Sequence, residues 1–311
     1  MAAKSPLSSP LETGRFAPSP TGPLHFGSLV AALASYLQVR SHSGRWLVRI
    51  EDIDPPREVP GSIDVMLKQL DDHGLEWDDQ VTYQSAHLDR YHEILKQLRD
   101  LQLVYYCQCN RQRLKSLGGV YDGKCSNLRH PAGDSALRLA VDKALPPGTA
   151  NGDSLVFNDQ IMGDFQQHIF RDIGDFIIRR RDGLISYQLA VVADDQYQGI
   201  TQVLRGADLL PSTPRQIVLQ KCLGFRTPAY LHIPLALNPE GQKLSKQHFA
   251  KPLQRGRERE NLWHALRWLG QDPHPELMAG SPEQILLWGL ENWNLCAIPA
   301  VAEGIPAPLE L

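Results

Sequence analysis

The chain has 311 residues, of which 42% are hydrophobic and 22% are charged, and its formal net charge at pH 7 is −3. These values are typical of a soluble globular protein of about two domains, and they exclude a disordered, collagen-like or coiled-coil chain. Because the net charge is close to zero, a nucleic-acid partner would need a local basic face.

Residues 1–13 form a polar N-terminal segment without the apolar core of a secretory signal. No later stretch approaches the ~20 consecutive apolar residues that a membrane-spanning helix needs. We therefore expect a flexible N-terminal extension, no membrane partner and a cytoplasmic location.

The segment 14–104 shows the order strand, loop, helix, strand, which predicts a βαβ unit with two parallel strands. Apolar residues at helical spacing indicate the helix, and compact apolar runs bounded by glycine or proline indicate the strands. Two amphipathic helices follow this unit. The predicted elements are the strand 15–17, the loop 18–27, the helix 29–39, the strand 46–50 and the helices 62–74 and 87–103.

The segment 105–183 is expected to be an inserted subdomain, in which residues 136–180 alternate in the manner of strands. The strand and helix pattern returns at 184–250, and a small helical C-terminal region occupies 251–311. The elements predicted after the insertion are strands at 187–193, 203–208 and 233–237, a helix at 214–223 with Thr213 as its N-cap, and two short tryptophan-bearing helices. The overall prediction is an α/β fold with an insertion.

Two loops carry candidate phosphate-binding residues. In the loop before the first helix, glycines let a ligand approach the backbone, the helix offers N–H groups to phosphate, and His25 can hydrogen-bond a phosphate oxygen. A later glycine-containing loop places Lys243 and Lys246 three residues apart, which suits a clamp on triphosphate oxygens. Each loop taken alone is also consistent with an ordinary surface turn.

Taken together, these motifs resemble the class I aminoacyl-tRNA synthetases of the glutamyl branch. Residues 25–28 (His-Phe-Gly-Ser) resemble the HIGH motif, and residues 243–247 (Lys-Leu-Ser-Lys-Gln) resemble the KMSKS motif. The segments 49–52 (Arg-Ile-Glu-Asp) and 205–208 (Arg-Gly-Ala-Asp) lie between them in the family's order. The resemblance covers about residues 14–250 and implies a Rossmann-type parallel sheet.

The resemblance implies activation of L-glutamate by ATP, with Mg²⁺, to glutamyl-adenylate. It implies catalytic roles for His25, Lys243 and Lys246, and ATP binding by His25, Gly27, Ser28 and Lys246. The residues implied for the glutamate site are Arg15, Phe16, Ala17, Pro18, Ser19, Glu51, Tyr187 and Arg205. This set is chemically reasonable because a substrate with two carboxylates and one ammonium needs guanidinium groups and a carboxylate. The arginines could instead form only structural ion pairs, and Tyr187 could be only a core aromatic.

The segment after Gln247 is too short for the helical anticodon-binding domain of the glutamyl-tRNA synthetases. In this respect the chain resembles the glutamyl-Q tRNA(Asp) synthetases, which transfer glutamate to queuosine in the anticodon of tRNA(Asp). The resemblance implies L-glutamate, ATP and queuosine-bearing tRNA(Asp) as partners of a monomer. The alternatives are a glutamyl-tRNA synthetase that charges the tRNA 3′ end, a ligase that joins an amino acid to a small amine, and a non-enzymatic RNA-binding protein.

Three of the five cysteines lie close together at Cys107, Cys109 and Cys125, which suggests a metal site before a disulfide in a cytosolic protein. The family resemblance implies one structural Zn²⁺ per chain, with Tyr121 as its fourth ligand. His130 is the chemically commoner ligand type. Three free thiols in a loop remain the alternative.

Three basic stretches are candidates for RNA contact, and each is equally consistent with a solvated face. Contacts of this kind to phosphate would make binding weaken as salt increases. The candidate residues are Arg111, Arg113, Lys115, Arg179, Arg180, Arg181 and the segment Lys251 to Arg259.

Overall fold

The computed structural model describes residues 11–145, 154–238, 240–244, 251–302, 304–306 and 308. Within these ranges no helix is long and apolar enough to cross a membrane. The strands are β1 (Thr13–Phe16), β2 (Arg45–Ile50), β3 (Thr82–Tyr83), β4 (Val104–Cys107), β5 (Ala136–Leu139), β6 (Ser154–Asp159), β7 (Gly163–His168), β8 (Phe176–Arg179), β9 (Gln202–Gly206), β10 (Ala229–Ile233), β11 (Ala236–Leu237) and β12 (Ile305–Pro306). The α-helices of the described ranges are α1 (Phe26–Arg40), α2 (Ser62–Asp72), α3 (Leu88–Asp100), α4 (Arg111–Ser116), α5 (Val141–Ala144), α6 (Tyr187–Tyr197), α7 (Thr213–Leu223), α8 (Glu258–Trp268) and α9 (Pro282–Asn292).

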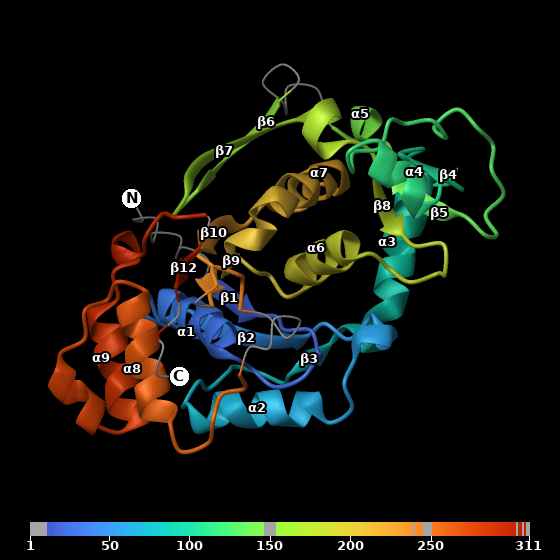
Figure 1. Cartoon of the computed structure of the whole chain (residues 1–311). Helices are drawn as coiled ribbons and strands as arrows, with labels where there is room; N and C mark the ends of the chain where they lie inside the picture. Colours follow the sequence, from blue (N-terminus) through green and yellow to red (C-terminus); the bar gives the residue numbers. More distant parts are fainter. Residues whose placement is uncertain are drawn as a thin grey trace, which may run out of the picture.

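The centre of the molecule is built from parallel strands, which confirms the predicted α/β class. One sheet has the order β1-β2-β3, and a second has the order β7-β6-β10-β9, in which only the β6–β7 pair is antiparallel. The backbone N–H of Thr201 donates to the carbonyl of Thr13 over 2.9 Å, so β9 and β1 lie edge to edge. The two sheets therefore form one layer (Figure 1).

Helices cover both faces of this layer. In β9, Val203 packs with α6 and α7, whereas the next residue, Leu204, packs with α1 and α8. In β2, Leu47 faces the α6 side and its neighbour Trp46 faces the α1 side. Consecutive side chains thus enter separate cores, as expected for a parallel sheet that is buried on both faces. This arrangement is the Rossmann-type layer that the family resemblance implied.

The helix α6 corrects the sequence-based prediction of a strand at 187–193. Ser186 caps this helix, since its hydroxyl accepts from the backbone N–H of Leu189 over 3.4 Å. The run from Leu189 to Asp195 is buried on all sides of the helix. Periodicity alone cannot tell a buried strand from a buried helix in an apolar run of this length. Here the run forms a helix that is buried on all sides because it packs between neighbouring elements.

Two smaller predictions also need correction. The strand predicted at 233–237 is divided, because β10 ends at Ile233 and β11 contains only Ala236 and Leu237. Thr213, predicted as an N-cap, is the first residue of α7, and Ser212 occupies the cap position. Both differences are shifts of one or a few residues at element ends.

The segment predicted as an insertion contributes to two places. The strands β4, β5 and β8 form an antiparallel sheet of their own. The hairpin β6–β7 instead extends the central layer, because Asp159 of β6 pairs with Tyr230 of β10. Beyond the central layer, α8 and α9 pack against α1 (Figure 1).

Candidate functional site

An open cleft of about 660 Å³ lies between the loop before α1 and the segment after β10. This volume is within the range of ordinary ligand pockets. Seven of the predicted site residues line it, namely Phe16, Pro18, Ser19, His25, Gly27, Ser28 and Lys243. Ala17 lies between two of them in sequence. Lys246 lies outside the described residues.

His25 and Gly27 shape the floor of this cleft. His25 is the N-cap of α1, and its Nδ1 accepts from the backbone N–H of Ser28 over 3.3 Å. A Cβ atom at Gly27 would lie 3.2 Å from the His25 ring and 3.5 Å from the Cβ of Ala236. The glycine therefore keeps the helix N-terminus open toward the cleft, where its N–H groups can meet an anion.

Two further charged residues line the cleft and were not among the predicted site residues. Asp208, in the turn after β9, forms an ion pair with the Nζ of Lys243. Arg57 also lines the cleft and forms an ion pair with Asp54 (2.5 Å). The Arg-Gly-Ala-Asp segment contained Asp208, but its ion-pair partner Lys243 lies 35 residues away and the pair has no local signature.

A second group of site residues is buried beside the cleft. We call Arg15, Arg49, Glu51, Asp195 and Arg205 the buried charge cluster. The Nε and Nη2 atoms of Arg15 donate to the two carboxylate oxygens of Asp195 over 3.1 and 3.3 Å, and Nη2 of Arg49 donates to the same carboxylate over 2.8 Å. Burial opposes ionisation of Asp195, but the two guanidinium groups outweigh it and hold its pKa below the usual value.

Glu51 is the second acidic member of the cluster. Its Oε1 lies 3.5 Å from Nη2 of Arg49, and its backbone N–H donates to the carbonyl of Pro18 over 3.0 Å. Burial raises the pKa of the Glu51 carboxyl, although the charges of Arg49 and Arg15 oppose this effect. A cation placed beside this carboxyl would favour its charged form.

Arg205 is held by four side chains at the end of β9. Its Nη1 donates to the hydroxyl of Tyr187 (3.3 Å), and its Nη2 donates to Thr213 (2.9 Å) and Gln216 (2.8 Å). Its Nε donates to Nε2 of His232 over 3.1 Å. No sequence motif marked His232.

The predicted glutamate residues meet in one place. Nη1 of Arg205 donates directly to the Tyr187 hydroxyl, and burial raises the pKa of this hydroxyl, on which the charges of Arg205, Glu51 and Arg15 also act. The cluster also adjoins the cleft, because the backbone N–H of Glu51 donates to the carbonyl of Pro18, which lines the cleft. The guanidinium groups and the carboxylate of this arrangement match the charges of a small molecule that carries both acidic and basic groups.

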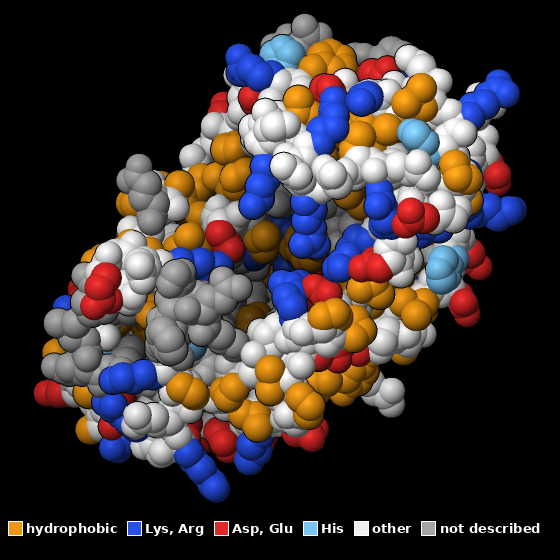
Figure 2. Space-filling view, turned by 45° about the vertical axis from the view of Figure 1, so that its right-hand side comes forward, with side chains coloured by type: hydrophobic (Ala, Val, Ile, Leu, Met, Phe, Trp, Pro, Cys, Tyr) orange, Lys and Arg blue, Asp and Glu red, His pale blue; other side chains and the backbone are white. Residues whose placement is uncertain are grey.

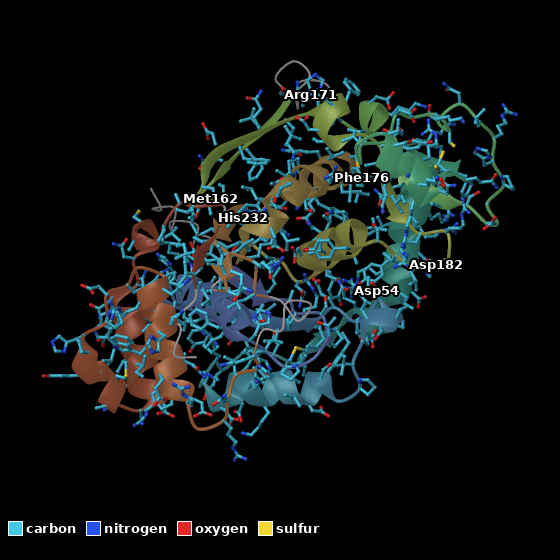
Figure 3. The ribbon with its side chains drawn as sticks, viewed as in Figure 1. Asp54, Met162, Arg171, Phe176, Asp182 and His232 are labelled. Atoms are coloured by element: carbon cyan, nitrogen blue, oxygen red, sulfur yellow. The ribbon has the colours of Figure 1, made fainter. Side chains whose placement is uncertain are left out.

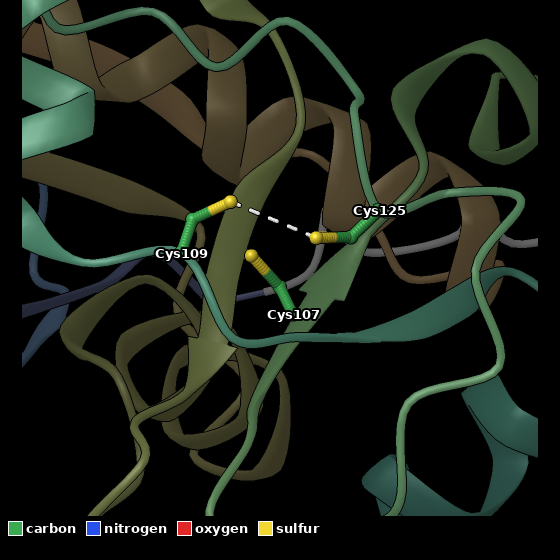
Figure 4. A group of neighbouring side chains, drawn as sticks. All are labelled: Cys107, Cys109 and Cys125. Carbon is green, nitrogen blue, oxygen red and sulfur yellow. Dashed lines mark hydrogen bonds between the residues drawn. The ribbon is translucent and has the colours of Figure 1, made fainter.

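The cysteines are brought together as predicted. We call Cys107, Cys109, Tyr121 and Cys125 the cysteine cluster, whose three cysteines are drawn in Figure 4. The three sulfur atoms lie within 4.8 Å of one another. The Tyr121 hydroxyl lies 3.5 Å from Cys107 and 3.4 Å from Cys109, and it accepts from the backbone N–H of Cys125 over 3.0 Å.

The chemistry of this donor set fits a metal ion. Arg138 lies 3.9 Å from the centre of the Tyr121 ring. Burial would raise the pKa of Cys107, but hydrogen bonds from Tyr121 and Arg138 outweigh it and lower this pKa to about 7, which favours the thiolate that binds metals. His130 is not part of the group of metal-ligating atoms found among the described residues, whereas the Tyr121 hydroxyl touches two of the thiols.

The basic residues predicted for RNA contact are in part engaged within the protein. Arg113 pairs with Asp122 through two bonds of 2.9 and 2.6 Å. Arg180 bridges Asp54 and Asp182, which Figure 3 shows on facing segments. Figure 2 shows further Lys and Arg side chains around a hollow in the middle of one face. Arg111 and Lys115 are exposed.

Comparison with known proteins points to one family. The sequence matches the family model described as "tRNA synthetases class I (E and Q), catalytic domain" over residues 13–276. A protein of Ectopseudomonas mendocina (strain ymp) named "Glutamyl-Q tRNA(Asp) synthetase" is 49% identical over 286 residues, covering 92% of this chain and 94% of that protein. A protein of the same name from Cronobacter sakazakii (strain ATCC BAA-894) is 50% identical over 294 residues, covering 94% of this chain and 96% of that protein.

The solved structures agree on the fold. A glutamate tRNA ligase from Elizabethkingia meningosepticum CCUG26117, solved in complex with its amino acid, has a TM-score of 0.77 at 24% identity. The match covers 96% of this chain and 67% of that chain. At this identity the likeness supports the class I synthetase fold and nothing finer.

Proposed function

The chain belongs to the glutamyl-Q tRNA(Asp) synthetase family of the class I tRNA synthetases, and we propose that it activates L-glutamate with ATP and transfers the glutamyl group to queuosine in the anticodon of tRNA(Asp). The observation that carries the proposal is that the buried charge cluster lies beside the open cleft, to which the backbone bond from Glu51 to Pro18 joins it. A dicarboxylic amino acid fits the first, and a nucleoside triphosphate fits the second. The chain acts as a monomer in this proposal.

On the amino-acid side, Arg15 and Arg205 bind the carboxylates of glutamate, Glu51 accepts a hydrogen bond from its ammonium group, and the Tyr187 hydroxyl orients it. On the nucleotide side, His25, Gly27 and Ser28 receive the phosphates at the N-terminus of α1. Phe16, Ala17, Pro18 and Ser19 connect the two sides. Lys243 and Lys246 stabilise charge on the phosphates, and Mg²⁺ supplies further neutralisation when it accompanies ATP.

The proposed reaction has two steps. An α-carboxylate oxygen of glutamate attacks the α-phosphorus of ATP, and the bond to the β-phosphate oxygen breaks, so pyrophosphate leaves with that electron pair. A queuosine hydroxyl then attacks the glutamyl carbonyl, AMP leaves, and the hydroxyl proton is released. The protein supplies binding, orientation and charge placement, and no covalent enzyme intermediate is needed.

The first step is tested by glutamate-dependent exchange of pyrophosphate into ATP, measured without tRNA. We expect exchange with L-glutamate and little with L-aspartate or L-glutamine, because the cluster must match the length and both charges of the side chain. A protein that exchanges only when tRNA is added, or equally well with L-glutamine, would contradict the proposal.

For the cysteine cluster we propose one structural Zn²⁺, held by Cys107, Cys109, Cys125 and Tyr121. Four protein ligands close the coordination sphere, which is the pattern of structural zinc sites. Metal analysis of the purified protein should find about one zinc per chain, and Cys107→Ser should lose it and lower the unfolding temperature. Cys222→Ser is the matched control, since Cys222 lies outside the cluster. Full zinc content in Cys107→Ser would contradict the assignment.

A further inference from the structure

Asp159 and His232 form a buried pair beside Arg205. Nδ1 of His232 lies 2.6 Å from Oδ2 of Asp159, and neither side chain is exposed to solvent. Nε2 of the same imidazole lies 3.1 Å from Nε of Arg205. The three side chains thus form a continuous chain of hydrogen bonds that ends in the buried charge cluster.

The chemistry of its two ends determines where the protons lie in this chain. A guanidinium has only donors, so Nε of Arg205 donates and Nε2 of His232 accepts. The imidazole proton is therefore on Nδ1, which donates to the Asp159 carboxylate. Burial and the charge of Arg205 lower the pKa of His232, although its bond to Asp159 opposes them, in agreement with a neutral ring.

Asp159 is itself fixed by the backbone. Its Oδ1 accepts from the backbone N–H groups of Ile161 (3.1 Å), Met162 (2.9 Å) and His232 (3.2 Å). The first two belong to the turn between β6 and β7, and Figure 3 shows Met162 and His232 close to each other. The position of the carboxylate therefore depends on two neighbouring elements of the fold.

The Asp159–His232 pair fixes the orientation of the Arg205 guanidinium at its Nε atom. Nε is bound by His232, and Nη2 is bound by Thr213 and Gln216. Nη1 is the nitrogen that reaches Tyr187, which belongs to the proposed glutamate site. A rotation of the guanidinium would break the bond to His232 and move Nη1 away from Tyr187.

We propose that Asp159 and His232 are positioning residues that hold Arg205 in the orientation that binds a carboxylate of L-glutamate. This inference rests on the proposed function. Because Arg205 contacts glutamate before and during the reaction, loss of its orientation raises KM for glutamate more than it lowers kcat. KM for ATP changes little, because the nucleotide is bound in the cleft.

The decisive variants are His232→Asn and His232→Gln. The amide of asparagine reaches the place of Nδ1 and can donate to Asp159, but it offers no acceptor to Arg205. The amide of glutamine reaches the place of Nε2 and can accept from Arg205. In glutamate-dependent pyrophosphate exchange, we expect His232→Asn to raise KM for glutamate about 10- to 100-fold and His232→Gln to raise it far less.

Two further variants complete the design. Asp159→Asn lets the imidazole adopt the other tautomer, in which Nε2 carries the proton. Nε2 and Nε of Arg205 are then both donors and their hydrogen bond is lost, so KM for glutamate should rise again. Tyr230→Phe is the matched control: Tyr230 lies on the same strand, and its hydroxyl accepts from Gln220 over 2.8 Å. We expect Tyr230→Phe to leave KM for glutamate unchanged.

The outcomes separate the inference from the proposed function. Wild-type protein without glutamate-dependent exchange contradicts the proposed function. Active wild-type protein with an unchanged KM in both His232→Asn and Asp159→Asn contradicts only the inference. If KM for glutamate rises equally in His232→Asn and His232→Gln and KM for ATP rises as well, the role of His232 is structural. That result also overturns the inference. If His232→Asn does not fold, KM for glutamate is compared between Asp159→Asn and Tyr230→Phe. A rise in Asp159→Asn alone supports the inference, and no rise contradicts it.

Discussion

The two parts of the proposed site, the buried charge cluster for the amino acid and the open cleft for the nucleotide, are built in different ways. On the amino-acid side, the side chains of Arg15 and Asp195 are only 4% and 7% exposed, and each ionic group has a partner fixed by the fold. On the nucleotide side, Lys243 and Asp208 are 44% and 36% exposed, and the cleft is open to water. In the proposed function, the buried cluster is preorganised for a small substrate, whereas the exposed ion pair of the cleft can exchange partners when a phosphate group binds.

The largest expected effect is on the buried side. Asp195→Ala leaves the guanidinium groups of Arg15 and Arg49 buried without their shared carboxylate. Breaking a buried ion pair in this way should lower the free energy of unfolding by about 3–5 kcal/mol. Chemical denaturation monitored by circular dichroism measures this difference.

The matched control is the exposed ion pair of the cleft. Asp208→Ala removes the partner of Lys243, and we expect a loss of about 1 kcal/mol or less, because exposed pairs are screened by solvent. Similar losses in Asp195→Ala and Asp208→Ala would show that burial does not distinguish the two sides of the site.

The next effect concerns catalysis on the open side. Lys246→Ala should reduce glutamate-dependent pyrophosphate exchange about 10²- to 10³-fold, as for loss of a preorganised charge that acts on the transition state. The affinity for glutamate should stay near its wild-type value, because this lysine is assigned to ATP. Unchanged exchange in Lys246→Ala would contradict its assignment to ATP.

The sequence predicted the open side better than the buried side. Two short motifs contain four of the predicted residues of the cleft, so neighbours in the sequence were enough to identify them. These residues are His25, Gly27, Ser28 and Lys243. The bond from Arg15 to Asp195 spans 180 residues, and the bond from His232 to Asp159 spans 73. Such pairs depend on how distant elements pack, and no local pattern encodes them.

The assignment of α6 shows the same limit. The residues 187–193 were predicted to form a buried strand because they are almost continuously apolar, and the structure has a helix there. The helical turn is what places Tyr187 and Asp195 toward the same cluster. In contrast, the spacing of Cys107, Cys109 and Cys125 was sufficient to predict that they meet, because the segment is short.

A smaller effect is expected from pH. The pKa of Asp195 is lowered in the folded state, so its contribution to stability is present above its unfolded pKa of about 3.9 and is lost as pH falls below that value. The pKa of Glu51 is raised, so this residue acts in the opposite sense, and its contribution is lost as pH rises above about 4.3.

Urea denaturation at a series of pH values tests this prediction with Asp195→Asn. The difference in unfolding free energy between wild type and Asp195→Asn should be constant near neutral pH and should shrink below about pH 4. A difference that grows on acidification would have the wrong sign for an ionised Asp195 in the native state.

The central claim is the identity of the acceptor, and one charging experiment tests it directly. Labelled glutamate, ATP and tRNA(Asp) are incubated with the protein, using tRNA that carries either queuosine or guanine in the anticodon. Each tRNA is used with or without periodate oxidation of its 3′ end; the queuosine diol is protected during the oxidation and freed again before charging. We expect labelling of queuosine-bearing tRNA whether or not the 3′ end is oxidised, and no labelling of the guanine form. Labelling that survives the guanine replacement and disappears after 3′ oxidation would show an ordinary glutamyl-tRNA synthetase and contradict the account.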